Sequence, residues 1–217
     1  MNIFSIRSVP KTKWSSDKPL NFSPKFKTVF VLCVGLILFG LGESLIITAS
    51  VGMSPWTVLA EGLSITTGLS IGVLTFLISL GLLLIWIPLK QNAGIGTILN
   101  VIIISAVIEW SLPYLPHPEN YLIKILQSIF GTLLVGVASG IYLIANLGAG
   151  PRDGLMTGSQ RLTGLPIAWV RILLEVFVIS IGWTLGGTIG IATIIFAIGV
   201  GPAVSLGLYS ISSISKR

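Results

Sequence analysis

The fold is decided by one short stretch of the chain, Gly148-Ala149-Gly150-Pro151-Arg152-Asp153-Gly154-Leu155. It is the most polar and most glycine-rich passage in an otherwise hydrophobic second half. A related stretch lies 96 residues earlier (148 − 52 = 96) and reads Gly52-Met53-Ser54-Pro55-Trp56-Thr57-Val58-Leu59. Glycine, proline and leucine recur in the same register, which indicates that the chain contains two copies of one unit.

The duplication extends along both halves at the same offset and without a gap. Further matching pairs are Gly35 and Gly131, Gly40 and Gly136, Gly62 and Gly158, and the triplets Thr67-Gly68-Leu69 and Thr163-Gly164-Leu165. Scattered matches arise by chance in glycine-rich apolar sequences. Shared Gly-x-x-Pro and Thr-Gly-Leu patterns in one register are much harder to obtain that way, so we interpret the match as an internal duplication.

The composition is that of an integral membrane protein. Of the 217 residues, 53% are hydrophobic and only 9% are charged, and the mean hydropathy is +0.97. Soluble domains carry about 25% charged residues. Apolar runs long enough to cross a bilayer, about 20 residues each, predict six transmembrane helices at 27–49, 71–89, 96–112, 123–146, 166–184 and 190–209.

Two further segments are predicted to be short half-helices, at about 55–65 and 151–162. Ser54 can cap the first of them, with Pro55 at its first position, and Gly68 and Gly164 close the two segments. Both are too short to span. The predicted fold class is therefore an all-α integral membrane protein with two three-helix repeats, each containing a half-helix.

The charges predict how this chain sits in the bilayer. We divide it into a flexible basic tail (1–27), a first repeat (28–112), a linker (113–122), a second repeat (123–210) and a tail (211–217). Basic residues mark cytoplasmic segments, and they cluster in both tails, near Lys90 and in the second half-helix. Both termini are thus predicted to be cytoplasmic and the linker extracytoplasmic. A transit peptide is the alternative interpretation of the first tail.

This topology predicts that the two repeats are inverted, because each has an odd number of spans. Inverted repeats with interrupted helices are typical of secondary transporters, and half-helix N-termini favour anionic groups. We therefore predict a small secondary transporter or permease of a small solute, for which an anion is one option. The alternative is a non-transporting scaffold or regulator, which would have a dry interior with every buried charge paired.

Other classes of function find little support in the sequence. The chain has one cysteine and one histidine, so no metal site or other cofactor is expected. No nucleophile–base pair or nucleotide-binding loop is present, and we expect no enzyme activity. The basic tail is not a nucleic-acid-binding surface. The expected partners are the lipid bilayer, a small solute and, because small bundles often dimerise, a second copy.

Seven residues are candidates for a substrate or ion path. Charged groups inside a membrane are expensive and usually face the bundle interior. The seven candidates are the charged residues Glu43, Arg152, Asp153, Arg171 and Glu175 and the polar residues Ser54 and Asn146.

Each candidate also has a structural alternative. Arg152 and Asp153 can form a local ion pair, and Arg171 and Glu175, one turn apart, can neutralise each other. Glu43 can carry protons or pair with Arg171 or Arg161.

Two more groups of residues have mainly structural interpretations. Asn146 and its equivalent Ser50 can simply cap helix ends. Trp86, Trp110, Trp183 and Tyr209 are predicted to lie at the membrane interface.

The two motifs and Arg161-Leu162-Thr163-Gly164 resemble the YczE/YyaS/YitT family of bacterial membrane proteins, most of all its YczE branch. The resemblance covers about residues 28 to 210. It implies a multi-pass protein of the bacterial cytoplasmic membrane. It implies no substrate and no catalytic residues.

Overall fold

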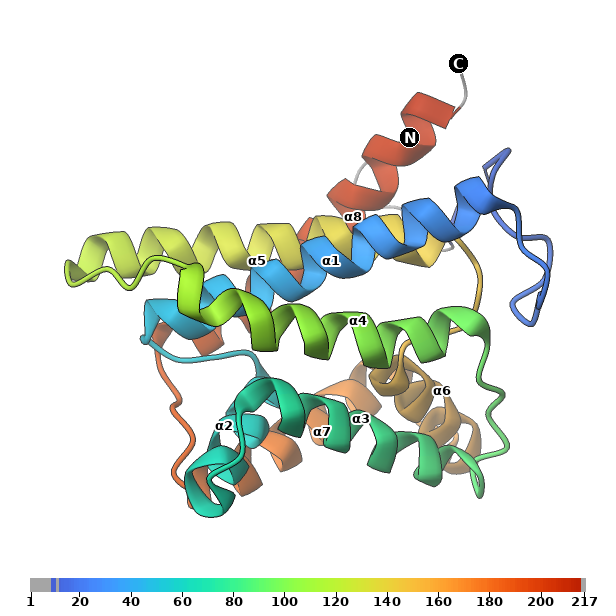
Figure 1. The fold of residues 1–217 in the computed structure, drawn as a ribbon. Helices are drawn as coiled ribbons and strands as arrows, with labels where there is room; N and C mark the ends of the chain where they lie inside the picture. The colour runs from blue at the N-terminus through green and yellow to red at the C-terminus, as the bar shows by residue number, and fades with distance from the viewer. Residues whose placement is uncertain (1–8, 11, 216–217) are drawn as a thin grey trace.

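The chain folds into α-helices joined by short loops (Figure 1). The computed structural model describes residues 9–10 and 12–215, with side chains up to Ile211. The elements are α1 (Phe26–Ala49), α2 (Pro55–Thr67), α3 (Ile71–Trp86), α4 (Ile95–Ser111), the 3-10 turn η2 (Leu112–Tyr114), α5 (Tyr121–Ile144), α6 (Pro151–Thr163), α7 (Ile167–Thr184) and α8 (Ile191–Ser215). No strand occurs in these described ranges.

Five helices are long and apolar enough to cross a membrane, which confirms an all-helical membrane protein. They are α1, α4 with η2, α5, α7 and α8. A sixth candidate is the pair α2 and α3, which is bent by 114° at the break between them. By itself α3 has 16 residues, because its helix ends at Trp86 and turns follow to Lys90, short of the predicted end at Leu89.

The two short helices have equivalent bounds. Adding 96 to the bounds of α2 gives those of α6. Their first turns start from Ser54 (φ −65°, ψ 153°) and Gly150 (φ −63°, ψ 156°). Both end at a glycine with positive φ, 74° at Gly68 and 70° at Gly164. The helices end slightly later than predicted, because these left-handed residues stop them.

The segments that precede the short helices pack against the opposite half of the chain. The Gly96 amide at the start of α4 donates to the Leu147 carbonyl over 2.8 Å. At the equivalent position, the Ala192 amide of α8 donates to the Val51 carbonyl over 3.0 Å. Each half therefore holds the connecting segment of the other, with the same backbone pairing.

The helices run between two ends of the molecule (Figure 1). In that view α1 and α4 run from right to left, and α3 and α5 run back. The antiparallel contact of α1 with α5 is close, because a Cβ on Gly35 would meet the Tyr142 amide at 3.0 Å and one on Gly42 would meet the Gly131 carbonyl at 2.9 Å. The short helices α2 and α6 begin near the middle and run outward to opposite ends (Figure 1).

The short helix α2 packs on α7, and α6 packs on α3. At equivalent positions of these two contacts, the small and the large residue have changed sides. Where α2 meets α7, Val58 faces Gly182, whose added Cβ would lie 2.6 Å from the Val58 carbonyl carbon. Where α6 meets α3, the small residue is Gly154 and the large one is Trp86. Trp86 is only 3% exposed, and its indole N–H donates to the Pro151 carbonyl over 2.9 Å.

The interface prediction for Trp86 is therefore wrong, since its ring fills the space opposite Gly154. Trp110 and Trp183 are 74% and 64% exposed, and Tyr209 is 36% exposed. Helix α8 also continues to Ser215, beyond the predicted end near Tyr209.

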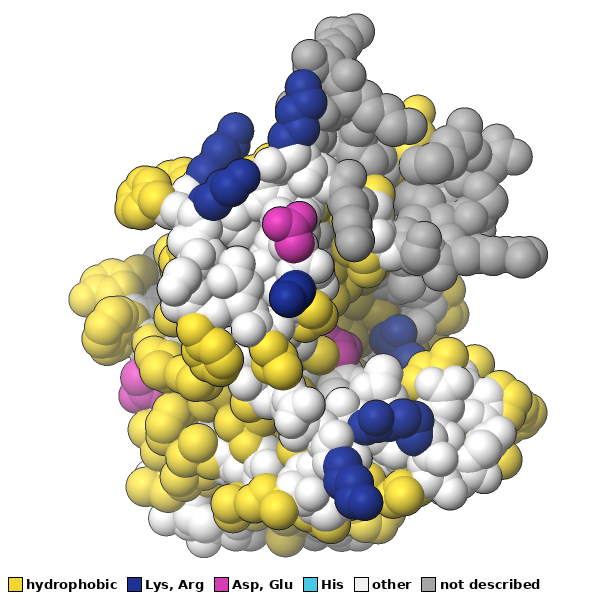
Figure 2. Space-filling model, turned by 90° about the vertical axis from the view of Figure 1, so that its right-hand side faces the viewer, with side chains coloured by type: hydrophobic (Ala, Val, Ile, Leu, Met, Phe, Trp, Pro, Cys, Tyr) yellow, Lys and Arg dark blue, Asp and Glu magenta, His cyan; other side chains and the backbone are white. Residues whose placement is uncertain are grey.

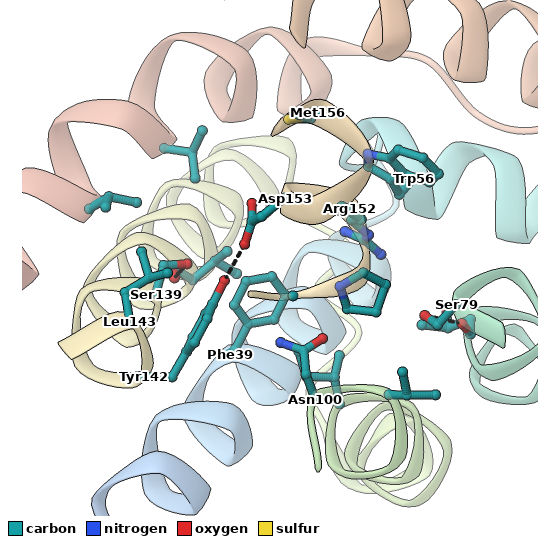
Figure 3. Close-up of a pocket in the computed structure, with 18 of the residues that line it drawn as sticks. Phe39, Trp56, Ser79, Asn100, Ser139, Tyr142, Leu143, Arg152, Asp153 and Met156 are labelled. Carbon is teal, nitrogen blue, oxygen red and sulfur yellow. Dashed lines mark hydrogen bonds between the residues drawn. The ribbon is translucent and has the colours of Figure 1, made fainter. Parts of the chain in front are cut away.

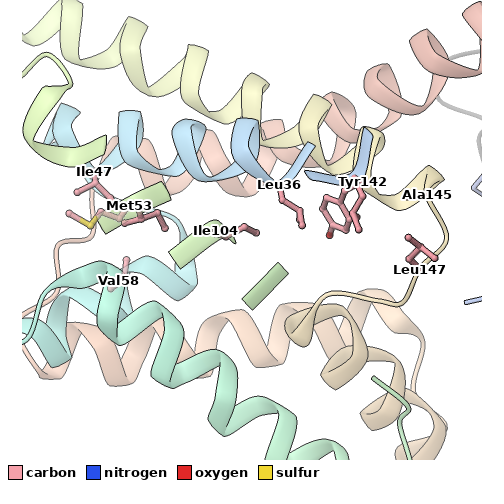
Figure 4. Close-up of a cluster of buried hydrophobic side chains, with 10 residues drawn as sticks. Leu36, Ile47, Met53, Val58, Ile104, Tyr142, Ala145 and Leu147 are labelled. Atoms are coloured by element: carbon pink, nitrogen blue, oxygen red, sulfur yellow. The ribbon is translucent and has the colours of Figure 1, made fainter. Parts of the chain in front are cut away.

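The largest buried apolar cluster joins the two halves (Figure 4). It combines residues of α1, the α1–α2 segment, α2, α4, α5 and the segment before α6. The members labelled in the figure are Leu36, Ile47, Met53, Val58, Ile104, Tyr142, Ala145 and Leu147. Residues of both halves therefore share one apolar core.

The described part of the N-terminal tail docks on the protein. The Ser16 amide donates to the Ala145 carbonyl over 3.0 Å, and the Asn146 side chain donates to the Ser16 carbonyl over 2.8 Å. The Thr28 hydroxyl donates to the Trp14 carbonyl, and Trp14 packs on the core cluster. A fully flexible tail is therefore the wrong prediction for residues 12–19, while residues 1–8 and 11 lie outside the described residues.

Replacing Asn146 with alanine is expected to release this tail. Asn146 and Ser50 are equivalent residues with φ of 52° and 53°, but of the two only Asn146 bonds to the described part of the tail. Trypsin cleavage after Lys13, followed by mass spectrometry, should be several-fold faster in Asn146→Ala. Ser50→Ala is the matched control, because it carries the same backbone strain. Equal cleavage of both variants would contradict this role of Asn146.

Candidate binding site

A cavity of about 230 Å³ lies in the middle of the molecule, where the two motifs meet. Figure 3 shows side chains from several helices converging on it. Its lining is Phe39, Trp56, Thr75, Ser79, Asn100, Val101, Ile104, Val135, Ser139, Tyr142, Leu143, Gly150, Pro151, Arg152, Asp153, Met156, Arg171, Glu175, Phe196, Val200 and Val204. The wall is mixed, with aromatic and aliphatic groups beside buried charges.

The cavity draws on equivalent positions of the two halves. Six pairs of lining residues are separated by 96 positions: Phe39 and Val135, Trp56 and Arg152, Thr75 and Arg171, Ser79 and Glu175, Asn100 and Phe196, and Ile104 and Val200. In four of these pairs at least one member is polar. The two halves thus supply the same backbone positions and different chemistry, with the ionised groups of these pairs in the second half.

Arg152 lies on the first turn of α6, next to the cavity. Its guanidinium carbon is 5.4 Å from the centre of the Trp56 ring, a cation–π arrangement. Its nearest acidic atom is Oε1 of Glu43, 4.0 Å from Nη1. Among the described residues, this guanidinium donates no hydrogen bond, although it has five N–H donors.

Glu43 belongs to α1 and lies behind Arg152. It is buried, with only 1% of its surface exposed. Its Oε2 accepts hydrogen bonds from the hydroxyls of Ser54 (2.8 Å) and Thr57 (2.9 Å). Its Oε1 has no hydrogen-bond partner in the described structure. The predicted structural partners Arg171 and Arg161 are thus wrong, since Arg152 takes that place. Ser54 holds Glu43 and does not line the cavity.

Asp153 follows Arg152 and lies on the cavity wall. The Tyr142 hydroxyl donates to its Oδ2 over 3.0 Å, as Figure 3 shows. No ion pair involving Asp153 occurs in the described part of the chain, so the predicted local pair with Arg152 is not formed. Arg152 and Asp153 therefore present one cation and one anion to the same cavity.

Arg171 and Glu175 pair with each other on α7. The distance between Nε and Oε1 is 2.8 Å. Both also line the cavity, so the two residues form an ion pair at the cavity wall. Their equivalents Thr75 and Ser79 also line the cavity. The Thr75 hydroxyl is buried without a hydrogen-bond partner.

Three other charged or polar residues lie away from the cavity. The Asn146 side chain holds the tail and is not among the residues that line the cavity. Glu61 accepts from the amide and hydroxyl of Thr188. Arg161 donates to the carbonyls of Leu89 and Lys90. The last two fasten the short helices to loops.

Sequence reasoning missed several lining residues. Trp56 could have been found, because it is equivalent to Arg152 at the offset of 96. Tyr142, Phe39 and Asn100 carry no local signal, since they lie within apolar runs of α5, α1 and α4. For metals, no group of three or more His, Cys, Asp or Glu in the described ranges could hold an ion.

Comparisons with known proteins identify relatives of nearly the full length. The profile of the DUF6198 family, described as a family of unknown function, matches residues 26–208. An uncharacterized protein of Haemophilus influenzae is 37% identical over 203 residues, which cover 94% of this chain and 92% of that protein.

Two Bacillus subtilis proteins are also similar. The uncharacterized membrane protein YczE is 35% identical over 167 residues, 76% of this chain and 77% of YczE. The uncharacterized protein YyaS is 28% identical over 174 residues, 75% of this chain and 83% of YyaS. No solved structure matches the chain.

Proposed function

The chain belongs to the DUF6198 family and is similar to YczE and YyaS, and from its site we propose that it is a small secondary transporter. The observation that carries the proposal is the central cavity, which is lined by six pairs of equivalent residues from the two halves. A site at the interface of two repeats is the recurring plan of such transporters.

The proposal assigns six spans, with α3 as the shortest. Its 16 residues rise about 24 Å at 1.5 Å per residue, so α3 crosses most of a ~30 Å hydrocarbon core. The segments before α2 and α6 enter the membrane from opposite ends of the molecule. Each short helix then returns to the end from which its own segment entered. With three spans in each half, the two repeats are inverted.

The charges favour a cytoplasmic location for one end. Figure 2 shows the end at which α6 lies, and Lys and Arg side chains are prominent on it. This end carries Lys90 after α3 and Arg161 on α6. By the positive-inside rule, it faces the cytoplasm of a bacterial cytoplasmic membrane, and both termini lie on that side.

Transport then follows from exchange between the halves. When the α2 half and the α6 half swap conformations, the central cavity opens to one side and then to the other. Arg152 and Trp56, at equivalent positions on the two short helices, meet at the cavity wall. Their contact separates when one short helix moves relative to the other.

The second candidate function is a scaffold or regulator. The interlocked halves favour it, because each connecting segment is held by the other half through hydrogen bonds such as that of Gly96. That function does not need a central cavity, and it predicts paired charges throughout. The unpaired Asp153 and the free N–H donors of Arg152 weigh against it.

A cysteine-accessibility experiment tests the transporter without knowledge of the substrate. In a Cys33→Ser background, Ser139→Cys places one thiol in the cavity, where Ser139 is 7% exposed. A small membrane-impermeant thiosulfonate should modify it from both sides of oriented membrane vesicles. Modification from a single side, or none, would overturn alternating access.

Two equivalent residues provide the sidedness control. Thr67 and Thr163 are exposed at the ends of α2 and α6. A maleimide that does not cross the membrane should label Thr67→Cys in intact cells and Thr163→Cys only after permeabilisation. Labelling of both from the same side would contradict the inverted topology.

A further inference from the structure

We propose that the central cavity binds a small zwitterion, with a carboxylate on the guanidinium of Arg152 and an ammonium group on the carboxylate of Asp153. The inference deepens the proposed transport function, on which it rests for its biological meaning. The binding itself is a property of the cavity and is testable without transport.

Arg152 supplies the anion-binding half. Among the residues that the structure describes, its guanidinium makes a 4.0 Å ion contact and a ring contact and no hydrogen bond, so its N–H donors are available to an acceptor in the cavity. A carboxylate binds such a fork with two charge-assisted hydrogen bonds. Arg152 also lies on the first turn of α6, where the helix dipole favours negative charge.

Asp153 supplies the cation-binding half. Its Oδ2 accepts a hydrogen bond from Tyr142, and the Gly150 backbone is a second neighbouring donor. A carboxylate has lone pairs for more donors than these two. A buried carboxylate without a cationic partner is costly, and an ammonium group offers both charge and donors. The rings of Phe39 and Tyr142, which meet edge-on at 6.3 Å, lie beside it and provide faces for a cation.

The charge balance favours a zwitterion over a simple anion. Arg171 and Glu175 neutralise each other. The remaining ionised groups at the cavity are Arg152, Asp153 and, behind them, Glu43. When all three are ionised, their net charge is −1. A simple anion would increase this negative charge, which is unfavourable in a low-dielectric site. A zwitterion leaves the sum unchanged and satisfies both groups.

The size of the cavity limits the ligand. A cavity of about 150 Å³ holds benzene, so by the same ratio one of about 230 Å³ has room for roughly nine non-hydrogen atoms. This space suits a small amino acid.

Calorimetric titration of the purified full-length protein in detergent tests the inference with ligands of matched size. Glycine, L-alanine, L-serine and β-alanine are the zwitterions, and propionate and ethylamine each lack one charge. At least one zwitterion should bind at least about tenfold more tightly than both single-charge analogues. Absence of binding by all four, or tighter binding of propionate or ethylamine, would overturn the inference.

Variants of the two charged residues sharpen the test. Asp153→Asn should lose at least about tenfold in zwitterion affinity and should no longer discriminate against propionate. Arg152→Gln should lose as much and should no longer discriminate against ethylamine. Arg161→Gln, an exposed position on the same helix, is the control and should bind as the parent does.

The two proposals fail separately in these experiments. Zwitterion binding without access of Ser139→Cys from both sides would leave the ligand class standing and overturn transport. Access of Ser139→Cys from both sides without zwitterion binding would support transport and overturn the ligand class. If Asp153→Asn and Arg152→Gln changed the preference between analogues no differently from Arg161→Gln, the assigned roles would be wrong.

Discussion

Replacing Gly154 with valine is expected to prevent α6 from packing on α3. A Cβ at Gly154 would lie 1.9 Å from Cζ2 of Trp86 and 2.4 Å from Cε2. Trp86 cannot move away easily, because it is 3% exposed and bonded to the Pro151 carbonyl. We expect a loss of about 3 kcal/mol, or a fall in Tm of roughly 6–12 °C for a chain of this size, measured by thermal unfolding in detergent.

The matched control for this prediction is Gly81→Ala on α3. A Cβ at Gly81 meets no atom within 4 Å, so this variant should unfold at or above the temperature of the parent. Removing the Trp86 indole, the group with which a Cβ at Gly154 would clash, gives a second check. Trp86→Ala destabilises by itself, but Gly154→Ala should cost less in that background than in the parent. Equal costs in both backgrounds would show that the indole is not the obstacle.

The Gly154–Trp86 contact shows how far the sequence predicts this fold. The bounds of α2 and α6 follow from local signals, since Pro55 and Pro151 start the helices and Gly68 and Gly164 stop them. The burial of Trp86 does not, because a tryptophan near the end of an apolar run is typical of the membrane interface. Only the three-dimensional pairing of α3 with α6 reveals the gap that it fills.

The candidate site was predictable to a similar extent. Rare charges in apolar helices identified Arg152, Asp153, Arg171 and Glu175, and all four line one cavity. Their partners were not predictable, because pairing across α1, α5 and α6 depends on how the helices cross. Tyr142, the hydrogen-bond donor to Asp153, has no distinguishing signal within α5.

Asn146 was assigned to the path because it is equivalent to Ser50 and precedes the motif. The equivalence is correct for the backbone, since both residues have positive φ. The side chain instead binds Ser16 of the tail. A duplicated backbone therefore does not imply duplicated roles, and the end that holds the tail has acquired a contact that the other end lacks.

Replacing Glu43 with alanine is expected to destabilise the centre of the protein and to impair ligand binding. The change removes the acceptor of the Ser54 and Thr57 hydroxyls, which are 0% and 1% exposed. It also removes the charge nearest to Arg152. Because the two hydroxyls also hydrogen-bond each other, one buried donor is left unsatisfied. This donor and the broken buried pair together cost about 2–4 kcal/mol, toward the lower end because the Arg152 side chain is 23% exposed.

A double-mutant cycle separates the two contributions of Glu43. Glu43→Gln keeps a carbonyl oxygen for the Ser54 and Thr57 hydroxyls and removes the charge, so its cost reports mainly the contact with Arg152. Thermal unfolding of Glu43→Gln, Arg152→Gln and the double variant should give a coupling of about 1–2 kcal/mol. Additive effects would mean that Glu43 supports the hydroxyls alone. In that case Arg152 is held only by the Trp56 ring, and its positive charge is free for a ligand whether or not Glu43 is ionised.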